Sequence, residues 1–278
     1  MSDVAGEYGE RSVIIPGIIC GNFRSLVWPY KMETDKIIKA ERKCLIWSEQ
    51  LEDATPAIVK MYYRRGIANF MREKILTFRA QREFRILNHL ERKGIPCSIP
   101  FFWTYGYCKE YGFYEIVCTR QIPDTKSLTD FLAPKQTVAK NIDLGPLFQM
   151  VRNMHQCGVY HGALSTKNIL IDARGKDQAK YYIIDLARGW LFPSSISGEK
   201  IAWHDLLKLV RNIEKDLGLG YCTPYLAQCG LGKGAIEKFY QDASRHKSYS
   251  RKQKRIKNAL KAEVFFLAIL THLKKRML

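Results

Sequence analysis

The sequence has no apolar run long enough to cross a membrane as a helix. The longest candidate is VFFLAIL at 264–270, whereas a membrane-spanning helix needs about 20 predominantly apolar residues. We therefore expect a soluble protein or, at most, a peripheral one.

Paired cysteines are also absent. The eight cysteines form no C-x-x-C motif and no cluster at zinc-ligand spacing, which argues against a zinc site. Cys44 and Cys118 lie in apolar stretches, where a reduced thiol packs as a small hydrophobic side chain. No secretory signal is recognisable at the start, so we expect reduced thiols and a cytoplasmic location.

Acidic residues are scarce relative to basic ones. The sequence has 45 Lys and Arg against 27 Asp and Glu, a formal net charge of +18. Such an excess suggests an anionic partner, which could be a nucleic acid, the phosphates of a nucleotide or an acidic membrane surface. The alternative is that these charges only keep the surface soluble. No nucleic-acid reader motif is present, so a nucleic-acid-binding protein is a minor alternative; it would bind oligonucleotides with steep salt dependence.

Strand patterns dominate the first half of the chain, after an irregular extension at residues 1–30. KIIKAE, KCLIWSEQ and PAIVKMYY predict a three-stranded antiparallel meander, with a turn near Glu41 and Arg42. FFWTYGYCKEYGFYEIVCTRQI predicts a hairpin that turns near Lys109 to Gly112. Between these two groups, apolar residues at three- and four-residue steps predict a helix from about Met71 to Arg92, which Gly94 and Pro96 would end.

Helical patterns dominate the second half. SLTDFLA begins with a capping-box variant, LFQMVRNMHQCGV and WHDLLKLVRNIEKDLG are amphipathic, and 233–278 is helical and basic. IPDTKSL is suited to a connection between two lobes. We therefore predict an N-terminal lobe over residues 1–118, with five strands and one helix, and a mainly helical C-terminal lobe over 119–278.

Two residues suggest a site that holds phosphate groups. Lys60 lies in the middle of an apolar strand, where a charge is costly unless it is paired. Glu83 lies on the apolar stripe of the following helix and could supply the partner. The alternatives are that Lys60 faces solvent on an edge strand and that Glu83 is exposed near Arg79 and Arg82.

A second group follows the dipeptide His161-Gly162. Asn168 begins the run NILI and Asp185 ends the run YYIID, so a hairpin would bring two oxygen-bearing side chains together, as Mg²⁺ requires. Asp205 precedes an apolar helical run. It either supports the His161 loop by accepting hydrogen bonds from backbone amides or is an acid at a helix N-terminus.

These segments together resemble a known family. MHQCGVYHGALSTKNILID, YYIIDLARG and WHDLLKLVRNI are similar to the bacterial lipopolysaccharide core kinases, the Kdo and heptose kinases of the protein-kinase-like superfamily, and the resemblance covers roughly residues 36–215. It implies a bilobal α+β protein-kinase-like fold, with ATP and Mg²⁺ between the lobes. The acceptor would be a sugar hydroxyl of the lipopolysaccharide core or of its lipid-linked precursor, at the cytoplasmic face of the inner membrane.

The resemblance also implies roles for individual residues. Lys60 matches the phosphate-binding lysine and Glu83 its helix partner. Asn168 and Asp185 match the two metal ligands. Two further residues match the family's catalytic loop and its support, namely His161 and Asp205.

The family pattern fails at one position. It reads H-G-D or H-R-D, but here the third residue is Ala163, which cannot accept a proton. Three explanations stay open: an engineered inactive enzyme, a natural pseudokinase that binds nucleotide or core sugar without turnover, or another group that does the work. Ser165 cannot act as a base at neutral pH, and Lys167 could contact the transferring phosphate but is a cation.

Two other motifs are altered. No G-x-G-x-x-G joins the first two strands, where Arg42 and Lys43 stand instead, and their cations could replace backbone amides. D-F-G becomes Asp185-Leu186-Ala187, which keeps the metal-binding carboxylate.

The C-terminal end combines basic and apolar segments. Residues 245–278 carry eleven Lys or Arg and one acid, Glu263. Such a tail could contact an anionic membrane face, at about 1 kcal/mol per basic residue near the surface. The alternative is a last helix that packs 264–270 on the C-terminal lobe and leaves its cations in water.

Overall fold

A computed structural model describes residues 36–41, 43–51, 53–64, 78–108, 112–133, 142–174, 179–229 and 231–244. The predictions for the N-terminal extension, the first residues of the helix expected from Met71, and the basic C-terminal tail lie outside these residues. Among the described residues, no helix is long and apolar enough to span a membrane.

The first half of the chain forms the predicted five-stranded antiparallel sheet, and its strand order is β1-β2-β3-β5-β4. The strands are β1 (Ile37–Glu41), β2 (Cys44–Gln50), β3 (Pro56–Arg64), β4 (Pro100–Cys108) and β5 (Gly112–Arg120). Because β3 lies between β2 and β5, Lys60 is on a central strand, and its placement on an edge strand is ruled out.

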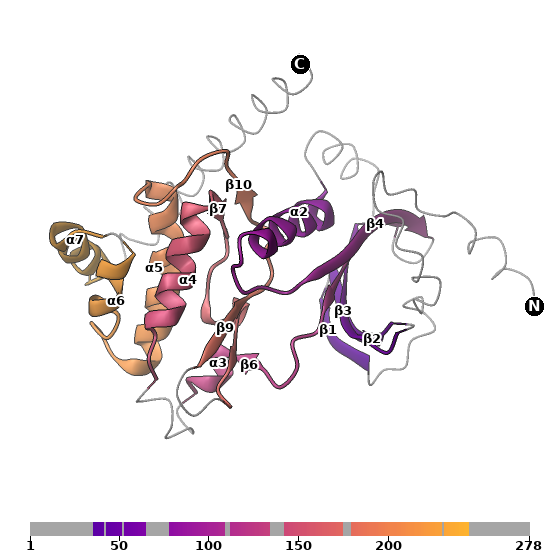
Figure 1. The fold of residues 1–278 in the computed structure, drawn as a ribbon, viewed down its shortest axis with the longest axis horizontal. Coiled ribbons are helices and arrows are strands. Elements are labelled where there is room, and N and C mark those ends of the chain that lie inside the picture. The colour runs from indigo at the N-terminus through magenta and orange to yellow at the C-terminus, as the bar shows by residue number, and fades with distance from the viewer. Residues whose placement is uncertain are drawn as a thin grey trace, which may run out of the picture.

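One helix, α2 (Arg79–Arg92), packs against this sheet (Figure 1). It buries Ala80, Glu83, Leu87 and Leu90, which belong to the stripe that the sequence pattern predicts, and it buries Ile86 as well. Phe78 has ψ 146 and no side-chain cap, so the helix begins at Arg79 and does not run on from Met71 through position 78.

The N-terminus of α2 is held from β5. The amide of Ala80 donates to the Glu115 carboxylate at 2.9 Å, and this carboxylate satisfies one of the amides that a helix leaves unpaired at its start. Glu115 is itself 6% exposed.

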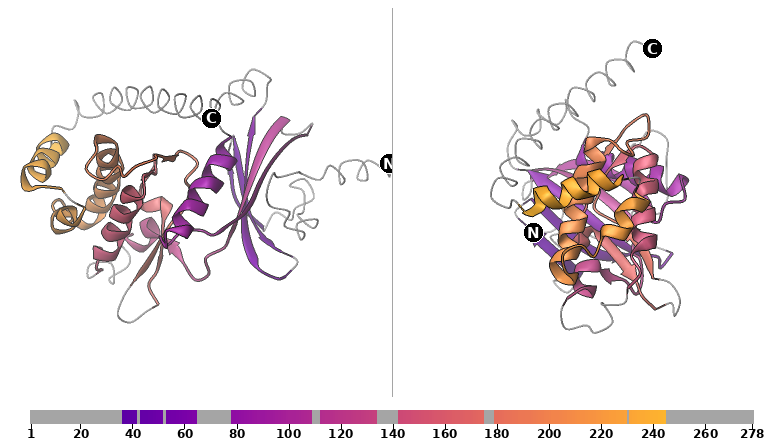
Figure 2. Two further views of the ribbon diagram at one scale, coloured as in Figure 1. Left: turned by 45° about the horizontal axis from the view of Figure 1, so that its top comes forward. Right: turned by 90° about the vertical axis from the view of Figure 1, so that its left-hand side faces the viewer.

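The second half is mainly helical, and its helices lie on the side of the molecule away from the sheet (Figures 1 and 2). The helices are α3 (Leu128–Phe131), α4 (Gly145–Gln156), α5 (Lys200–Leu217), α6 (Thr223–Gln228) and α7 (Lys233–Ser244), with the 3-10 turn η4 (Thr166–Asn168). Ser127 caps α3 by accepting a hydrogen bond from the Asp130 amide at 3.1 Å, as the capping-box variant predicts.

Short strands between these helices flank the loops that contain His161, Asn168 and Asp185. β6 (Lys126–Ser127), β8 (Ile169–Asp172) and β9 (Lys180–Ile183) form one small sheet, and β7 (Val159–Tyr160) pairs with β10 (Trp190–Leu191). The predicted hairpin of NILI and YYII is therefore present as β8 and β9, in register from Ile169 opposite Ile183.

The two halves are joined at the end of β9. The amide of Ile183 donates to the Pro96 carbonyl at 3.0 Å, and the Ser98 amide donates to the Ile183 carbonyl at 3.3 Å. These bonds tie β9 to the chain that follows α2, so the residues after β9 emerge beside α2 and β3. The arrangement is a bilobal protein-kinase-like α+β fold.

Candidate active site

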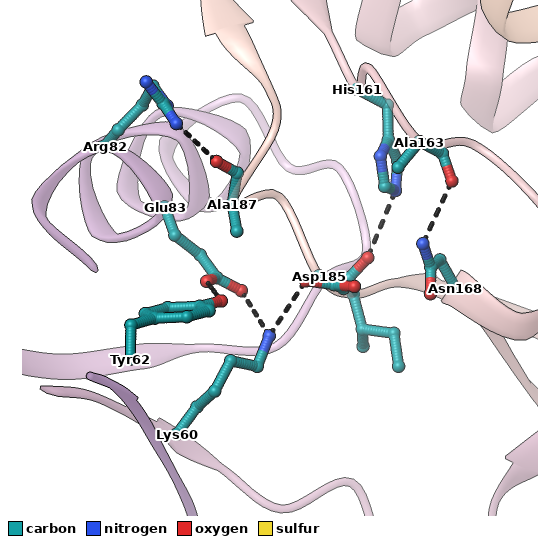
Figure 3. A network of polar contacts seen from close by, with 10 residues as sticks. Lys60, Tyr62, Arg82, Glu83, His161, Ala163, Asn168, Asp185 and Ala187 are labelled. Carbon is teal, nitrogen blue, oxygen red and sulfur yellow. Dashed lines mark hydrogen bonds and ion pairs between the residues drawn. The ribbon is translucent and has the colours of Figure 1, made fainter. Parts of the chain in front are cut away.

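Lys60 lies at the meeting point of three elements. Its Nζ is 2.8 Å from Glu83 Oε1 on α2 and 3.1 Å from Asp185 Oδ1 after β9 (Figure 3). Burial alone would lower the pKa of Lys60, but the carboxylates of Glu83 and Asp185 outweigh it and hold that pKa well above its usual value. The lysine is therefore a fixed cation in the cleft.

Glu83 is 2% exposed and is held by two donors. Besides Lys60, the Tyr62 hydroxyl donates to Glu83 Oε2 at 2.7 Å. Tyr62 was not among the predicted site residues. Alternate residues of a strand share a face, so its position two residues after Lys60 was the signal that could have found it.

The neighbouring arginines do not take the place of Lys60. Arg82 donates to the Ala187 carbonyl at 2.6 Å and lies 5.0 Å from the Trp190 ring centre, whereas Arg79 lies 6.0 Å from the Tyr62 ring centre. Glu83 is buried, so the alternative prediction that it is an exposed helix residue is wrong.

Asp205 anchors the loop that follows β7. Its carboxylate accepts from the His161 amide at 2.7 Å and from the Gly162 amide at 3.0 Å, and it is 1% exposed. Since α5 begins at Lys200, Asp205 lies beyond the first turn and is not an N-terminal helix acid. A buried carboxylate with two backbone donors is a rigid support for the loop.

His161 is fully buried and points toward β9. Its Nε2 lies 3.1 Å from the Ile184 carbonyl, and Nδ1 has no hydrogen-bond partner among the described residues. Burial lowers the pKa of His161, and the charges of Asp205 and Asp185 only partly offset it. A neutral ring that donates from Nε2 orients the residues before Asp185.

Ala163 is 6% exposed and offers no proton acceptor from its side chain. Its carbonyl accepts from Asn168 Nδ2 at 3.0 Å (Figure 3), so the loop keeps its shape although the acid is absent. The structure therefore confines the departure to one side chain.

Asn168 and Asp185 fit a Mg²⁺ ion. The Asn168 amide nitrogen is committed to Ala163, which leaves Oδ1 as the atom able to bind a hard cation. Asp185 has φ 61, its side chain is 44% exposed, and one of its oxygens bonds to Lys60. Burial opposes ionisation of Asp185, but Lys60, His161 and Arg188 outweigh it and lower its pKa.

Among the described residues, no group of three or more His, Cys, Asp or Glu side chains is arranged to hold a metal ion. Mg²⁺ is typically held by one or two protein carboxylates together with substrate phosphates. A pair of ligands is therefore consistent with Mg²⁺ bound together with a nucleotide.

Lys60, Tyr62, Glu83, Asn168 and Asp185 line a cavity of about 1350 Å³ between the two halves. Its lining includes the polar residues Lys60, Asn168 and Asp185 and the apolar residues Ile46, Ile58, Val117 and Leu170. Lys39 and Lys43 add positive charge near the first two strands, where a glycine-rich loop is missing. Lys167 is exposed and also lines the cavity.

The comparisons with known proteins agree with this geometry. The family model for the lipopolysaccharide kinase (Kdo/WaaP) family matches residues 30–225. The serine/threonine-protein kinase RIO1 of Chaetomium thermophilum is 28% identical over 151 residues, which are 50% of this chain and 26% of that protein. The chain thus spans about a quarter of that curated relative.

One solved structure shares the fold of this chain. The structure titled "WaaP in complex with acyl carrier protein" superposes with a TM-score of 0.55 at 16% identity, and covers 79% of this chain and 88% of that chain. The Rio2 kinase of Chaetomium thermophilum gives a TM-score of 0.49 at 16% identity, covering 81% of this chain and 70% of that one.

Proposed function

Because the chain belongs to the lipopolysaccharide kinase (Kdo/WaaP) family, we propose that it binds ATP with Mg²⁺ in this cavity and acts on a sugar hydroxyl of the lipopolysaccharide inner core, Kdo or heptose. The observation that carries the proposal is the ion pair of Lys60 with Glu83 and Asp185, because it unites three separate elements at the cavity. Phosphoryl transfer depends mainly on such positioning and on charge neutralisation.

Different residues of the cavity suit the base, the phosphates and the metal ion of the nucleotide complex. The apolar residues Ile46, Ile58 and Val117 suit a flat base, and Lys60 suits the phosphates. Asn168 Oδ1 and Asp185 would hold Mg²⁺, which supplies neutralising charge for the phosphate oxygens when bound. Asp205 keeps the His161 loop in place through the two backbone amides.

Ala163 limits the rate of transfer. In the reaction the acceptor oxygen bonds to the γ-phosphorus, the bond to the β-phosphate oxygen breaks, and the hydroxyl proton must leave. A positioned base contributes about 10²–10⁴-fold, so we propose an impaired kinase that keeps Lys60, Asn168 and Asp185 for binding nucleotide and metal.

Ala163 also favours a second candidate, a pseudokinase that binds nucleotide or core sugar without turnover. Both candidates place the protein in the cytoplasm or at the cytoplasmic face of the inner membrane, where the basic segment 245–278 would contact anionic lipids.

Thermal stabilisation by Mg²⁺–ATP tests the nucleotide site without turnover. At 100 times Kd, binding should stabilise the protein by about 2.7 kcal/mol, and Asp185→Ala should abolish the effect. Asp216→Ala is the matched control, because Asp216 is exposed on α5 away from the cavity. Equal stabilisation of both variants, or none in the unsubstituted chain, would contradict the proposed site.

An aspartate substituted for Ala163 distinguishes the impaired kinase from the pseudokinase. Ala163→Asp should raise ATP-dependent phosphorylation of core sugars by about 10²–10⁴-fold, whereas Ala163→Asn, of nearly the same size but without a base, should not. If Ala163→Asp is no more active than the present chain on any core sugar, the impaired-kinase proposal fails and the pseudokinase is favoured.

A further inference from the structure

Arg82 joins α2 to the segment that follows Asp185. Its Nη2 donates to the Ala187 carbonyl at 2.6 Å, two residues after Asp185 (Figure 3). Its guanidinium also lies 5.0 Å from the centre of the Trp190 ring, within the distance of a cation–π contact. The next residue on α2 is Glu83, which belongs to the ion pair of the site. One side chain therefore connects this helix with two points of the segment after the metal-ligand candidate.

Trp190 extends this connection to the catalytic loop. It lies in β10, where it pairs with Tyr160 of β7, the residue directly before His161. The elements approach closely at Gly189, where an added Cβ would lie 2.9 Å from the Tyr160 carbonyl oxygen and 2.9 Å from Ile86 Cδ1 on α2. The segment is therefore packed between α2 and the strand that leads into the catalytic loop.

The backbone at Asp185 needs to be restrained from its surroundings. Asp185 has φ 61, a left-handed conformation that is uncommon for residues other than glycine, and such a conformation persists only where the surrounding structure fixes it. Before it, His161 Nε2 lies 3.1 Å from the Ile184 carbonyl. After it, the Gly189 amide donates to the Leu186 carbonyl at 2.8 Å and closes a turn. Neither of these two contacts joins the segment to α2.

Arg82 supplies a backbone contact between the segment and α2. Lys60 bridges Glu83 and Asp185 through its ion pairs, but these contacts hold the Asp185 side chain and not the backbone. The Arg82 guanidinium is planar and presents its donors in a fixed geometry, and it bonds to the backbone carbonyl of Ala187. It therefore fixes the backbone after Asp185 at a set position relative to α2.

We propose that Arg82 is a positioning residue for the metal site. It holds the segment that carries Asp185 in the arrangement in which the carboxylate binds Mg²⁺ together with the nucleotide. As a cation, Arg82 is not itself a metal ligand, so it acts through Ala187 and Trp190. The inference rests on the proposed function and deepens it, because it names a residue that controls the metal ligand from another element.

The expected effect is confined to the metal. Residues that orient a metal ligand typically change metal affinity about 10–100-fold when they are removed. The apolar residues suited to the base, Ile46, Ile58 and Val117, lie on β2, β3 and β5, away from the contacts of Arg82 with Ala187 and Trp190. Loss of the guanidinium should therefore weaken the contribution of Mg²⁺ and leave the metal-free affinity for nucleotide unchanged.

Calorimetry with ATP measures this difference. ATP is titrated into the full chain in Mg²⁺ and again in EDTA, and the ratio of the two affinities gives the contribution of the metal. We expect Arg82→Gln to lower that ratio by about tenfold or more, with an unchanged affinity in EDTA. Arg82→Lys should recover part of the ratio, because lysine keeps a donor for the Ala187 carbonyl but has no planar group to lie over Trp190.

Arg85→Gln is the matched control. Arg85 is also an arginine of α2, but it is exposed and is not among the described residues that line the cavity. The substitution removes the same charge from the same helix. It should leave both the affinity in EDTA and the ratio intact.

Hydrogen exchange of the ligand-free chain tests the restraint without metal or nucleotide. The Gly189 amide bonds to the Leu186 carbonyl in the turn after Asp185, so it reports opening of this segment. Arg82→Gln should speed exchange of this amide several-fold, whereas Arg85→Gln should not. Amides of β2 and β3 should exchange at an unchanged rate in both variants, because the opening is local.

The outcomes separate this inference from the proposed function. Equal ratios in Arg82→Gln and Arg85→Gln, or unchanged exchange of the Gly189 amide, would overturn the role of Arg82 even if Mg²⁺–ATP binds. An equal loss of affinity in EDTA and in Mg²⁺ would also overturn it, because that result indicates a general disturbance of the cavity. If the unsubstituted chain binds ATP no better with Mg²⁺ than without, the proposed function fails, and hydrogen exchange still decides whether Arg82 holds the segment.

Discussion

Tyr62→Phe isolates one contact that holds the candidate active site together. The change keeps the ring on β3 and removes only the hydroxyl, which donates to Glu83 Oε2 at 2.7 Å. Tyr62 is 7% exposed and Glu83 2%, so water cannot readily replace the lost donor. A hydrogen bond to a charged group contributes about 1.5–3 kcal/mol. Because Lys60 still holds Oε1, we expect a loss of about 2 kcal/mol in the free energy of unfolding.

Urea denaturation at neutral pH measures this loss, and Tyr181→Phe is its matched control. Tyr181 is 3% exposed, and its hydroxyl donates at 2.8 Å to the Asp143 carbonyl, a neutral acceptor. Hydrogen bonds to neutral groups contribute about 0.5–1.5 kcal/mol, so Tyr181→Phe should cost about half as much.

A double-mutant cycle of Tyr62→Phe with Glu83→Gln tests whether the charge of Glu83 causes this loss of stability. If the hydroxyl acts through the charge of Glu83, the two substitutions should be non-additive by about 1 kcal/mol, as residues in contact commonly are. The reasoning would be refuted if Tyr62→Phe cost no more than Tyr181→Phe, or if the two substitutions in the cycle were additive.

Three further predictions concern the catalytic loop. Gly162→Ala should lower the urea midpoint more than Gly94→Ala. Both glycines have positive φ, but only at Gly162 would the added Cβ meet a backbone oxygen, 2.2 Å from that of Arg188; equal losses would contradict this close contact. Asp205→Ala should lower the free energy of unfolding by about 2–5 kcal/mol, since it leaves the buried His161 amide and the partly buried Gly162 amide without their acceptor. A loss under about 1 kcal/mol would count against the support role. Burial lowers the pKa of His161 below 6.5 in the folded state, so the unfolded chain binds more protons below that pH and stability should fall from about pH 7 to pH 5. His161→Gln should lessen that fall in urea midpoints, and an unchanged slope would refute it.

Local patterns were sufficient for the strands of the first sheet and for the start of α3. Period-two and period-four apolar spacing predicted the five strands and the buried stripe of α2, because these spacings follow directly from strand and helix geometry. Ser127 with Asp130 predicted the start of α3 for a similar reason, since a cap depends on residues three apart. The sequence pattern did not predict that α2 begins at Arg79. The Ala80 amide in its first turn is capped by Glu115 from a distant strand, and no local spacing encodes such a contact.

The residue types of the site were also readable from the sequence, but their mutual contacts were not. Lys60, Glu83, Asn168, Asp185 and Asp205 could be named because a strand, a helix or a hairpin places each residue type at a recognisable step along the chain. Their roles in binding nucleotide and metal stay predictions that the proposed experiments test.

What the sequence by itself determined was therefore the five strands of the first sheet, the hairpin of β8 and β9, most of the helices, and the loss of the acid at Ala163. Only the tertiary structure decided that β3 is central, that Tyr62 shares Glu83 with Lys60, and that Arg188 packs on Gly162. The physical reason is that sheet order and side-chain contact join segments from 21 to 125 positions apart, and such contacts depend on how whole elements pack.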